Sequence, residues 1–191
     1  MSIPIQMIHI HYNGKYLNLL DSDDRSPLYR VKVWPHSPQM EMVRSSNETN
    51  PPNYTSGTPN PPAPICTAAF KTFSLQVKLR VHSHEVLLQR EGTLTRTYNF
   101  TSSVFPHATL TWSADGALTG DYKLADEARG GGLIARFRNK VFSCQEVGSF
   151  ELVGELDEAF RDEVVISGLA VLAMVQSLNL AGMVLLGGSP N

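Results

Sequence analysis

Apolar and polar residues alternate along most of the chain before its C-terminal part. In the segment 6–12, Ile8 and Ile10 fall on one face and His9 and His11 on the other. A period of two residues is typical of a half-buried β-strand, in which successive side chains point to opposite sides. The Asn13-Gly dipeptide that follows favours a tight hairpin turn. The pattern therefore predicts that the chain begins with paired strands.

The two-residue alternation of apolar and polar side chains recurs in further segments, which are separated by residues typical of turns. The predicted strands are 6–12, 16–20, 28–34, 39–44, 75–81, 85–90, 93–101, 109–113, 118–124, 133–139, 141–143 and 150–153. Many short strands at this spacing are typical of a closed barrel or a sandwich. We therefore expect a mainly β fold.

One segment, 45–64, breaks the pattern. It contains six prolines and four asparagines and almost no apolar side chains. Such a composition does not bury enough surface to order itself. Since the strands on both sides read as one continuing sheet, we predict a surface loop within a single domain that spans 1–191.

The C-terminal part predicts a helix over 157–182. Asp157 suits the N-cap position, and acidic residues follow in the first turns, where they complement the helix dipole. From Val164 to Val175 the helix is apolar on every face, and no charged residue follows Glu163. A helix of this kind must be surrounded by other apolar groups.

Three surroundings can cover the apolar surface of this helix. The apolar run is long enough for a membrane anchor, but Ser167 and Gln176 interrupt it and no basic cluster flanks it. A helix packed on an open sheet would keep one polar face, which this helix lacks. A helix inside a barrel would be enclosed by the apolar inner face of every strand. We therefore predict a closed antiparallel barrel around a hydrophobic C-terminal helix.

Composition narrows the classes of partner. The chain has 191 residues, of which 42% are hydrophobic and 18% are charged, with a net charge of −2. This balance gives no global attraction to nucleic acid or to an anionic membrane. Cys66 and Cys144 lack the spacing of a zinc site or a disulfide framework and are expected to be buried. The N-terminus carries neither the basic region nor the apolar run of a secretory signal, so we expect a cytoplasmic protein.

Candidate chemistry is sparse. The pairs His9 and His11, and His82 and His84, are spaced to share one strand face and can bind a metal if a carboxylate joins them. Solvent-facing histidines are the simpler interpretation, and we expect neither a metal nor a cofactor. The glycine-rich segment 129–132 lacks the Lys-Ser/Thr of a P-loop and favours a hairpin turn over a phosphate cradle. The acidic residues at 155–163 are interpreted as a helix start, and no catalytic residue is assigned.

Four residues are candidates for a ligand site: Arg96, Tyr98, His107 and Trp112. Alternation places Arg96 on the inner face with Leu94 and Tyr98. A buried arginine needs a carboxylate or a ligand, unless a bulge sends it outward. Tyr98, His107 and Trp112 can line the same end of a barrel, although Trp112 also fits an ordinary core.

The order of several short motifs resembles that of small fungal proteins with a tubby C-terminal-like domain, related in fold to plant LURP-one proteins and phospholipid scramblases. The motifs are SPLYRVKV at 26–33, SPQMEM at 37–42, TAAFKTF at 67–73, FTS at 100–102, LTW at 110–112, DYKLAD at 121–126, LIARF at 133–137, GSFEL at 148–152 and DEVVISGLAV at 162–171. The resemblance covers most of the chain. It implies a barrel of about twelve strands around a central helix, and it does not assign an activity.

Two classes of function follow from these expectations. In the first, the protein binds an apolar small molecule in a barrel pocket, and if it is an enzyme it is a cofactor-free cyclase or isomerase of fungal secondary metabolism that acts by positioning its substrate. In the second, it is a non-enzymatic adaptor that binds lipid, a membrane surface or a protein. The low net charge favours the first class. The sequence leaves the ligand and the oligomeric state open.

Overall fold

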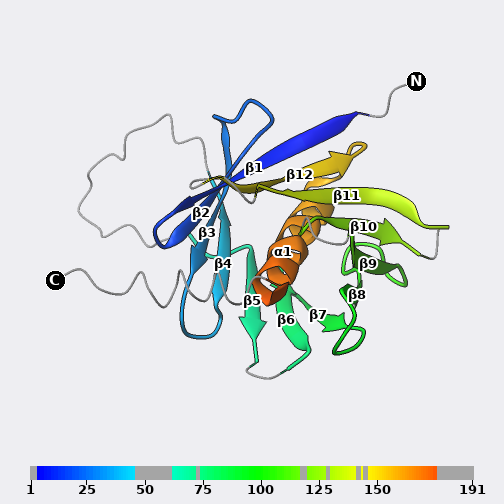
Figure 1. The fold of residues 1–191 in the computed structure, drawn as a ribbon. Coiled ribbons are helices and arrows are strands. Elements are labelled where there is room, and N and C mark those ends of the chain that lie inside the picture. The colour runs from blue at the N-terminus through cyan, green and yellow to red at the C-terminus, as the bar shows by residue number, and fades with distance from the viewer. Residues whose placement is uncertain are drawn as a thin grey trace, which may run out of the picture.

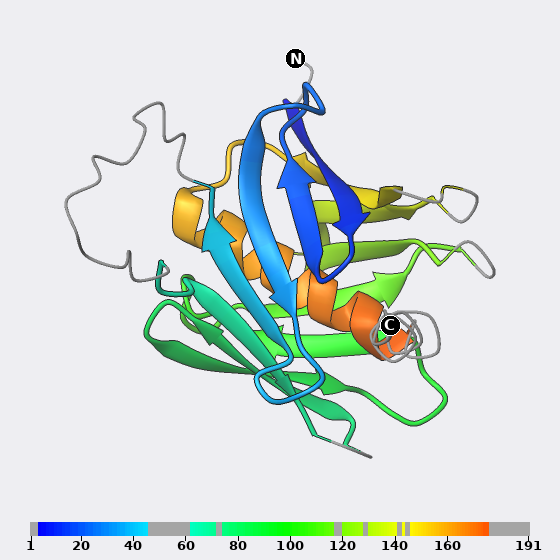
Figure 2. The same cartoon turned by 90° about the vertical axis from the view of Figure 1, so that its left-hand side faces the viewer.

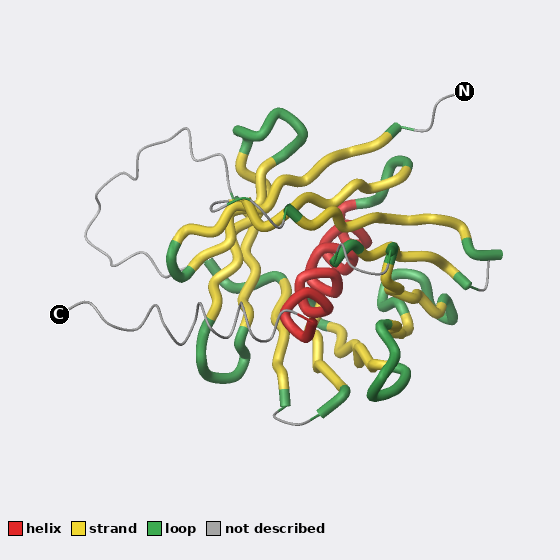
Figure 3. The backbone as a smooth tube through the Cα atoms, in the orientation of Figure 1, coloured by secondary structure: helices red, strands yellow, loops and turns green. Residues whose placement is uncertain are grey.

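The fold is a closed barrel of twelve antiparallel strands around one helix (Figures 1 and 3). The sequence pattern predicted the closed barrel and its helix, and the family resemblance implied the number of strands. The computed structural model describes residues 4–45, 62–71, 74–116, 120–127, 130–140, 143 and 146–175. The strands are β1 (Ile5–Asn13), β2 (Tyr16–Leu20), β3 (Pro27–Val33), β4 (Met40–Arg44), β5 (Cys66–Phe70), β6 (Gln76–Val81), β7 (His84–Arg90), β8 (Thr97–Thr101), β9 (Thr109–Ala114), β10 (Tyr122–Asp126), β11 (Gly132–Asn139) and β12 (Glu146–Val153). Each strand pairs with its neighbours in sequence, and β1 pairs with β12 to close the barrel.

The helix α1 (Glu158–Val175) runs through the interior of this barrel, with strands on both sides of it in Figure 2. The inner face of each strand supplies alternate apolar side chains, such as Ile8 and Ile10 on β1, which are fully buried. Burying one such side chain stabilises the fold by about 1.5–3 kcal/mol. The apolar side chains of the helix between Val164 and Leu172 are therefore enclosed by apolar side chains of the strands.

Two details fix the position of α1. The backbone N–H of Phe160 donates to Asp157 Oδ1 at 2.9 Å, which confirms the predicted N-cap. Further along the helix, Gly168 lies directly against Phe150 and Trp112, and a Cβ atom added there would lie 2.6 Å from Phe150 Cε1. Trp112 Nε1 donates to Ser167 Oγ at 3.0 Å in the same region. A glycine is thus required for the helix to approach these rings.

The strand order gives the barrel two distinct ends. The β8–β9 and β10–β11 connections lie beside the start of α1, because all three line one cavity. Since the strands alternate in direction, the β2–β3, β4–β5 and β6–β7 connections share this end, here called the helix-start end. The β1–β2, β3–β4, β5–β6, β7–β8, β9–β10 and β11–β12 connections form the opposite end, here called the helix-exit end.

Some predicted boundaries were wrong. The strand expected at 93–101 begins only at Thr97, and Leu94 is 95% exposed instead of facing inward. Arg90 Nε donates to the carbonyl oxygen of Thr95 at 2.7 Å, and the N–H of Glu91 donates to the carbonyl oxygen of Thr97 at 3.0 Å. These bonds close a turn in which the two-residue period no longer applies.

Other boundaries move or lie outside the described residues. The strand β10 begins at Tyr122 and not at residue 118, and β12 begins at Glu146 and not at residue 150. Ser143 is not in a strand. Most of the predicted loop 45–64, Cys144 and residues 176–182 of the predicted helix lie outside the described residues.

Candidate functional site

The four candidate ligand residues do not form one site. Arg96 precedes β8 at the helix-exit end, where its Nε donates to the hydroxyl of Tyr122 at 3.2 Å. Tyr98 is buried and packs edge-on against Tyr122 with ring centroids 6.2 Å apart. Trp112 is fully buried in the core against α1. His107 is exposed in the β8–β9 connection with φ 75°, at the other end of the barrel.

The structure therefore groups Arg96 and Tyr98 with a residue that the sequence did not single out, Tyr122. The guanidinium carbon of Arg96 lies 5.4 Å from the ring centroid of Tyr122, which suits a cation–π contact. Burial, followed by the neighbouring Tyr122, raises the pKa of the Tyr98 hydroxyl. This group is a packed aromatic cluster in which Arg96 already has protein partners.

A cavity of about 320 Å³ lies at the helix-start end. It is lined by Phe105, Ala108, Leu110, Asp126, Gly132, Leu133, Ile134, Glu155, Leu156, Asp157 and Phe160. Most of these side chains are apolar, and they come from the β8–β9 connection, β9, the β10–β11 hairpin and the start of α1. Sequence reasoning missed this cavity, because its walls come from segments that no local pattern connects.

The wall formed by Phe105 is held by a buried carboxylate of α1. Glu163 is fully buried, and it accepts hydrogen bonds from Ser102 Oγ at 2.5 Å and from the N–H and Oγ of Ser103, both at 2.6 Å. Ser102 Oγ in turn accepts the N–H of Phe105 at 3.0 Å. Phe105 packs edge-on against Phe160 with ring centroids 4.8 Å apart. The β8–β9 connection is thus fastened to the helix that it faces.

A second buried carboxylate, Asp162, fastens the opposite side of the helix start. It accepts hydrogen bonds from the Tyr29 hydroxyl at 2.7 Å and from Arg44 Nη2 at 2.5 Å, and His82 Nε2 lies 3.1 Å from its Oδ2. Burial and then the charge of Asp162 raise the pKa of Tyr29. His82 lies in the β6–β7 turn with φ 52°, so it does not share a strand face with His84.

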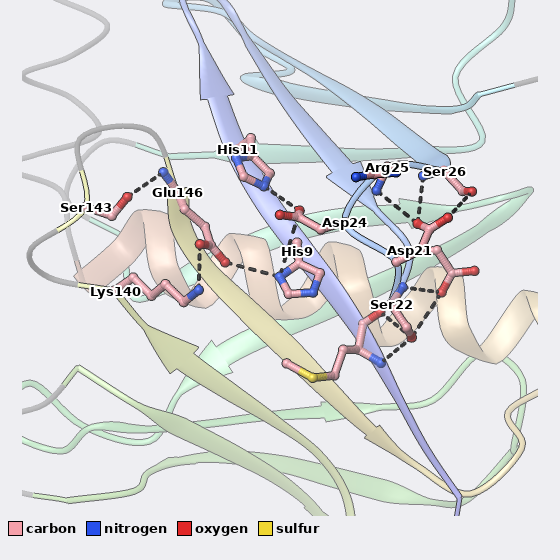
Figure 4. Close-up of polar contacts among 12 residues, drawn as sticks. His9, His11, Asp21, Ser22, Asp24, Arg25, Ser26, Lys140, Ser143 and Glu146 are labelled. Atoms are coloured by element: carbon pink, nitrogen blue, oxygen red, sulfur yellow. Dashed lines mark hydrogen bonds and ion pairs between the residues drawn. The ribbon is translucent and has the colours of Figure 1, made fainter.

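The remaining histidine pair joins a chain of charged groups on the outer face of β1 (Figure 4). His9 Nδ1 lies 3.2 Å from Glu146 Oε1, and His11 Nε2 lies 2.8 Å from Asp24 Oδ1. Lys140 Nζ is 2.6 Å from Glu146 Oε2. Burial acts to raise the pKa of Glu146, but the hydrogen bonds of Lys140 and His9 hold it below its usual value. These contacts tie the β2–β3 connection and the start of β12 to β1.

His9, His11 and their carboxylate partners are not arranged as a metal centre. Among the residues that the structure describes, no group of three or more His, Cys, Asp and Glu side chains is placed to hold a metal ion. Gly130 and Gly131 of the glycine-rich segment lie between β10 and β11 with φ of 74° and 79°, and the N–H of Gly131 donates to the carbonyl of Asp126 at 2.9 Å. That hydrogen bond is the pattern of a turn, as the sequence favoured.

Comparison with known proteins gives a likeness at the level of the fold. A solved X-ray structure of a protein from Arabidopsis thaliana superposes with a TM-score of 0.55 and 13% sequence identity, over 90% of this chain and 91% of that chain. No family model and no curated protein matches the sequence. The likeness to a plant barrel agrees with the predicted fold, while the fungal origin and the tubby-like family name stay predictions. In the part of the chain that is described, no helix has the length and apolar character needed to cross a membrane.

Proposed function

We propose that the protein binds an apolar small molecule in the cavity at the helix-start end. The observation that carries the proposal is the combination of a volume of about 320 Å³ with walls made mostly of Phe, Leu and Ile side chains. Small-molecule sites are concave, mostly apolar and roughly 300–1,000 Å³ in volume. A groove on the outer face of β7 to β9 is larger, about 500 Å³, but most of the residues along it are polar.

The proposal places the ligand away from Arg96, Tyr98 and Trp112, at the end of the barrel where the β8–β9 connection carries His107. Trp112 and Tyr98 pack against protein partners in the core, and His107 lies apart from Arg96. The helix-start cavity offers apolar side chains that border open space, such as Leu133 and Leu156. Fastening of the β8–β9 connection through Glu163 supports a preformed wall, which lowers the entropic cost of binding.

The finer form of the proposal is a cofactor-free cyclase or isomerase of fungal secondary metabolism. An apolar cavity that holds a flexible polyene or terpenoid in a folded conformation lowers the barrier to cyclisation by positioning alone. No catalytic residue is assigned in this scheme. Incubation of the protein with such substrates, followed by chiral product analysis, tests it: an enriched ring isomer supports the activity, and the uncatalysed product ratio contradicts it.

Binding itself is tested with the neutral dye N-phenyl-1-naphthylamine, whose fluorescence rises in an apolar site. The variant Ala108→Trp fills the cavity from its wall, and Ala63→Trp makes the same change on an exposed residue outside it. We expect saturable binding to the parent protein and to Ala63→Trp, with at least tenfold weaker binding to Ala108→Trp. Equal binding by all three proteins contradicts the site, and no binding to the parent contradicts the function.

A second candidate function, a non-enzymatic adaptor on a membrane surface, is favoured by the helix-exit end. Three neighbouring connections there, along the lower edge of Figure 1, each carry one exposed apolar side chain that is within four residues of a basic one in the sequence; the pairs are Trp34 with Lys32, Leu75 with Lys71, and Leu94 with Arg90. Lys32 Nζ lies 3.6 Å from the ring centroid of Trp34. Apolar and basic groups together suit an anionic lipid surface.

Sedimentation with phosphatidylserine vesicles separates this candidate from the first. The adaptor function predicts binding that falls when Leu94→Gln and Trp34→Gln are combined, while Leu87→Gln, on the side wall of the barrel at β7, leaves it unchanged. Absence of vesicle binding by the parent protein contradicts the adaptor function and leaves the cavity proposal in place.

A further inference from the structure

The strands β7 and β8 separate toward the helix-start end of the barrel. Their register contains two pairs, Gln89 with Asn99 and Arg90 with Tyr98, and the structure describes every residue from 84 to 101. On its other side, β7 pairs with β6 from residue 84 to residue 89 without a register shift. Residues 84–88 of β7 therefore have a paired strand on one side only.

The hydrogen bonds at the end of β7 show which backbone groups face the open side. The N–H of Arg90 donates to the carbonyl oxygen of Leu75, on the β6 side, at 2.8 Å, and the N–H of Glu91 donates to the carbonyl oxygen of Thr97, on the β8 side, at 3.0 Å. Successive residues of a strand direct their N–H and C=O groups to alternate sides. The odd-numbered residues of β7, Leu87 among them, therefore present their backbone groups to the open side. Such an edge can pair with an added strand.

A groove of about 500 Å³ lies along this edge on the outer face of the barrel. Its walls include Leu87 and Gln89 of β7, Asn99 and Thr101 of β8, and Thr109 of β9. The side chain of Leu87 is 45% exposed, while most of the other side chains along the groove are polar. The groove thus combines a strand edge with one apolar contact and several hydrogen-bonding groups.

Two buried polar atoms on the same face have no hydrogen-bond partner within the protein, namely Asn99 Oδ1 and Thr111 Oγ1. Asn99 and Thr111 are opposite each other in the register of β8 and β9, and Thr111 is only 5% exposed. Buried polar atoms in proteins nearly always have a partner, so an unpartnered pair indicates that one is missing. A carboxamide oxygen accepts hydrogen bonds, and a hydroxyl group both accepts and donates. The missing partner therefore carries a hydrogen-bond donor.

We infer that the open edge of β7 binds an extended peptide segment of another protein as an added strand. The backbone of the segment pairs with that of Leu87, and a side chain with an N–H or O–H group, such as Asn, Gln, Ser or Thr, lies against Asn99 Oδ1. Over residues 84–88 the added strand is about 16 Å long, at roughly 3.3 Å per residue. In this mode of binding, main-chain hydrogen bonds supply affinity and the side-chain contacts supply specificity. The inference is independent of the ligand proposed for the helix-start cavity.

A second copy of this chain is the competing occupant, because its own β7 has the same open edge. In that case β7 of one barrel would pair with β7 of the other. The second β7 would bring its paired strand β6 with it. Since Thr101 and Thr109 bound the groove on its far side, a single extended chain fits the opening more readily than an edge of a second barrel.

Proline substitutions test the open edge in the free protein. At residue 87 a proline removes an N–H group that faces the opening, whereas at residue 88 it removes one that faces β6. We expect Leu87→Pro to unfold at nearly the same urea concentration as Leu87→Ala. Leu88→Pro should unfold at a clearly lower concentration than Leu88→Ala. Equal losses for the two proline variants would show that both sides of β7 are paired and would overturn the inference.

A library of random seven-residue peptides, displayed on phage between flexible linkers, supplies the binding probe. We expect to recover peptides that bind Leu87→Pro at least tenfold more weakly than Leu87→Ala. Asn99→Leu should weaken the same peptides at least threefold, because it removes the unpartnered carboxamide oxygen. Asn18→Leu is the matched control, since it makes the same change on β2, away from the groove. If no recovered peptide is sensitive to Leu87→Pro, or if Asn18→Leu has the same effect as Asn99→Leu, the inference is wrong.

Backbone methylation of a selected peptide separates strand addition from binding by side chains alone. Two versions carry N-methyl groups on alternate residues, in the two possible registers. An added strand pairs with β7 through every second N–H, so we expect one version to bind at least tenfold more weakly than the other. Equal binding of the two versions contradicts strand addition. A dimer of the free protein that Leu87→Pro dissociates, measured by sedimentation velocity, would identify a second copy as the occupant and would also contradict the inference.

Discussion

Replacing Gly168 by alanine is expected to destabilise the barrel, although alanine is the better helix former. The added methyl group would lie 2.6 Å from Phe150 Cε1, 2.8 Å from Phe150 Cζ and 3.0 Å from Trp112 Cζ2. Both rings are fully buried and belong to the strands that enclose α1. They have little room to move, because protein interiors are close-packed.

The magnitude follows from two opposing effects. Overpacking a core by one methyl group costs about 1–3 kcal/mol. Exchange of glycine for alanine inside a helix returns about 1 kcal/mol. Because the clash is with two rigid rings, we take the upper part of the first range and expect a net loss of about 1–2 kcal/mol in the free energy of unfolding.

Urea unfolding followed by circular dichroism measures this loss. The double variant Gly168→Ala, Phe150→Leu is the matched control, since a leucine removes the ring atoms nearest to the new methyl group. We expect the penalty of Gly168→Ala to be smaller in the Phe150→Leu background than in the parent protein. If Gly168→Ala is as stable as the parent or more stable, the helix does not pack against these rings and the reasoning is refuted.

Three further predictions concern other parts of the molecule. Burial acts to raise the pKa of Glu146, but hydrogen bonds from Lys140 and His9 hold it below the usual 4.5. The hydrogen bond with His11 likewise holds the pKa of Asp24 below the usual 3.8, against the effect of burial. The stability that they contribute is present above those usual values and is lost as the pH falls through the lower pKa values of the folded state, so Lys140→Ala is expected to weaken the acid dependence in unfolding curves between pH 5 and about 2; an unchanged dependence contradicts it. Burial, aided by the charge of Asp162, raises the pKa of the Cys66 thiol to about 12, so peptide mapping after iodoacetamide at pH 8 should find Cys66 unmodified in the folded protein and modified in urea; rapid modification of the folded protein would show that the thiol is accessible. Leu94→Gln should change the free energy of unfolding by less than about 0.5 kcal/mol, because the side chain is 95% exposed; a loss above 1 kcal/mol in urea unfolding would place Leu94 in the core.

The barrel and its helix were predictable because their signal is local and repeated. Alternation identifies the strands, and an apolar surface on every side of 164–175 leaves an enclosed helix as the consistent arrangement. Asp157 was identified as the N-cap because capping depends on residues three positions apart. Leu94 was misplaced because the turn at 91–96 is closed by an arginine side chain that no two-residue period reveals.

The site was not predictable for the opposite reason. Asp162 and Glu163 read as an ordinary acidic helix start, yet both are fully buried. Their partners Tyr29 and Ser102 lie far from them in the sequence, and only the closed barrel brings them together. One signal of this burial was present in the sequence, which is that the carboxylates of Asp162 and Glu163 directly precede the apolar helical segment 164–175, which has no polar face. The cavity combines segments that are equally far apart.

The most direct test of ligand binding at the helix-start end is a methyl NMR titration with N-phenyl-1-naphthylamine. The account predicts that saturable shifts are largest for the methyl groups of Leu133, Ile134 and Leu156, which line the cavity. The methyl groups of Leu94, at the helix-exit end, should not move. Shifts centred on Leu94, or no saturable shifts at all, would contradict the account.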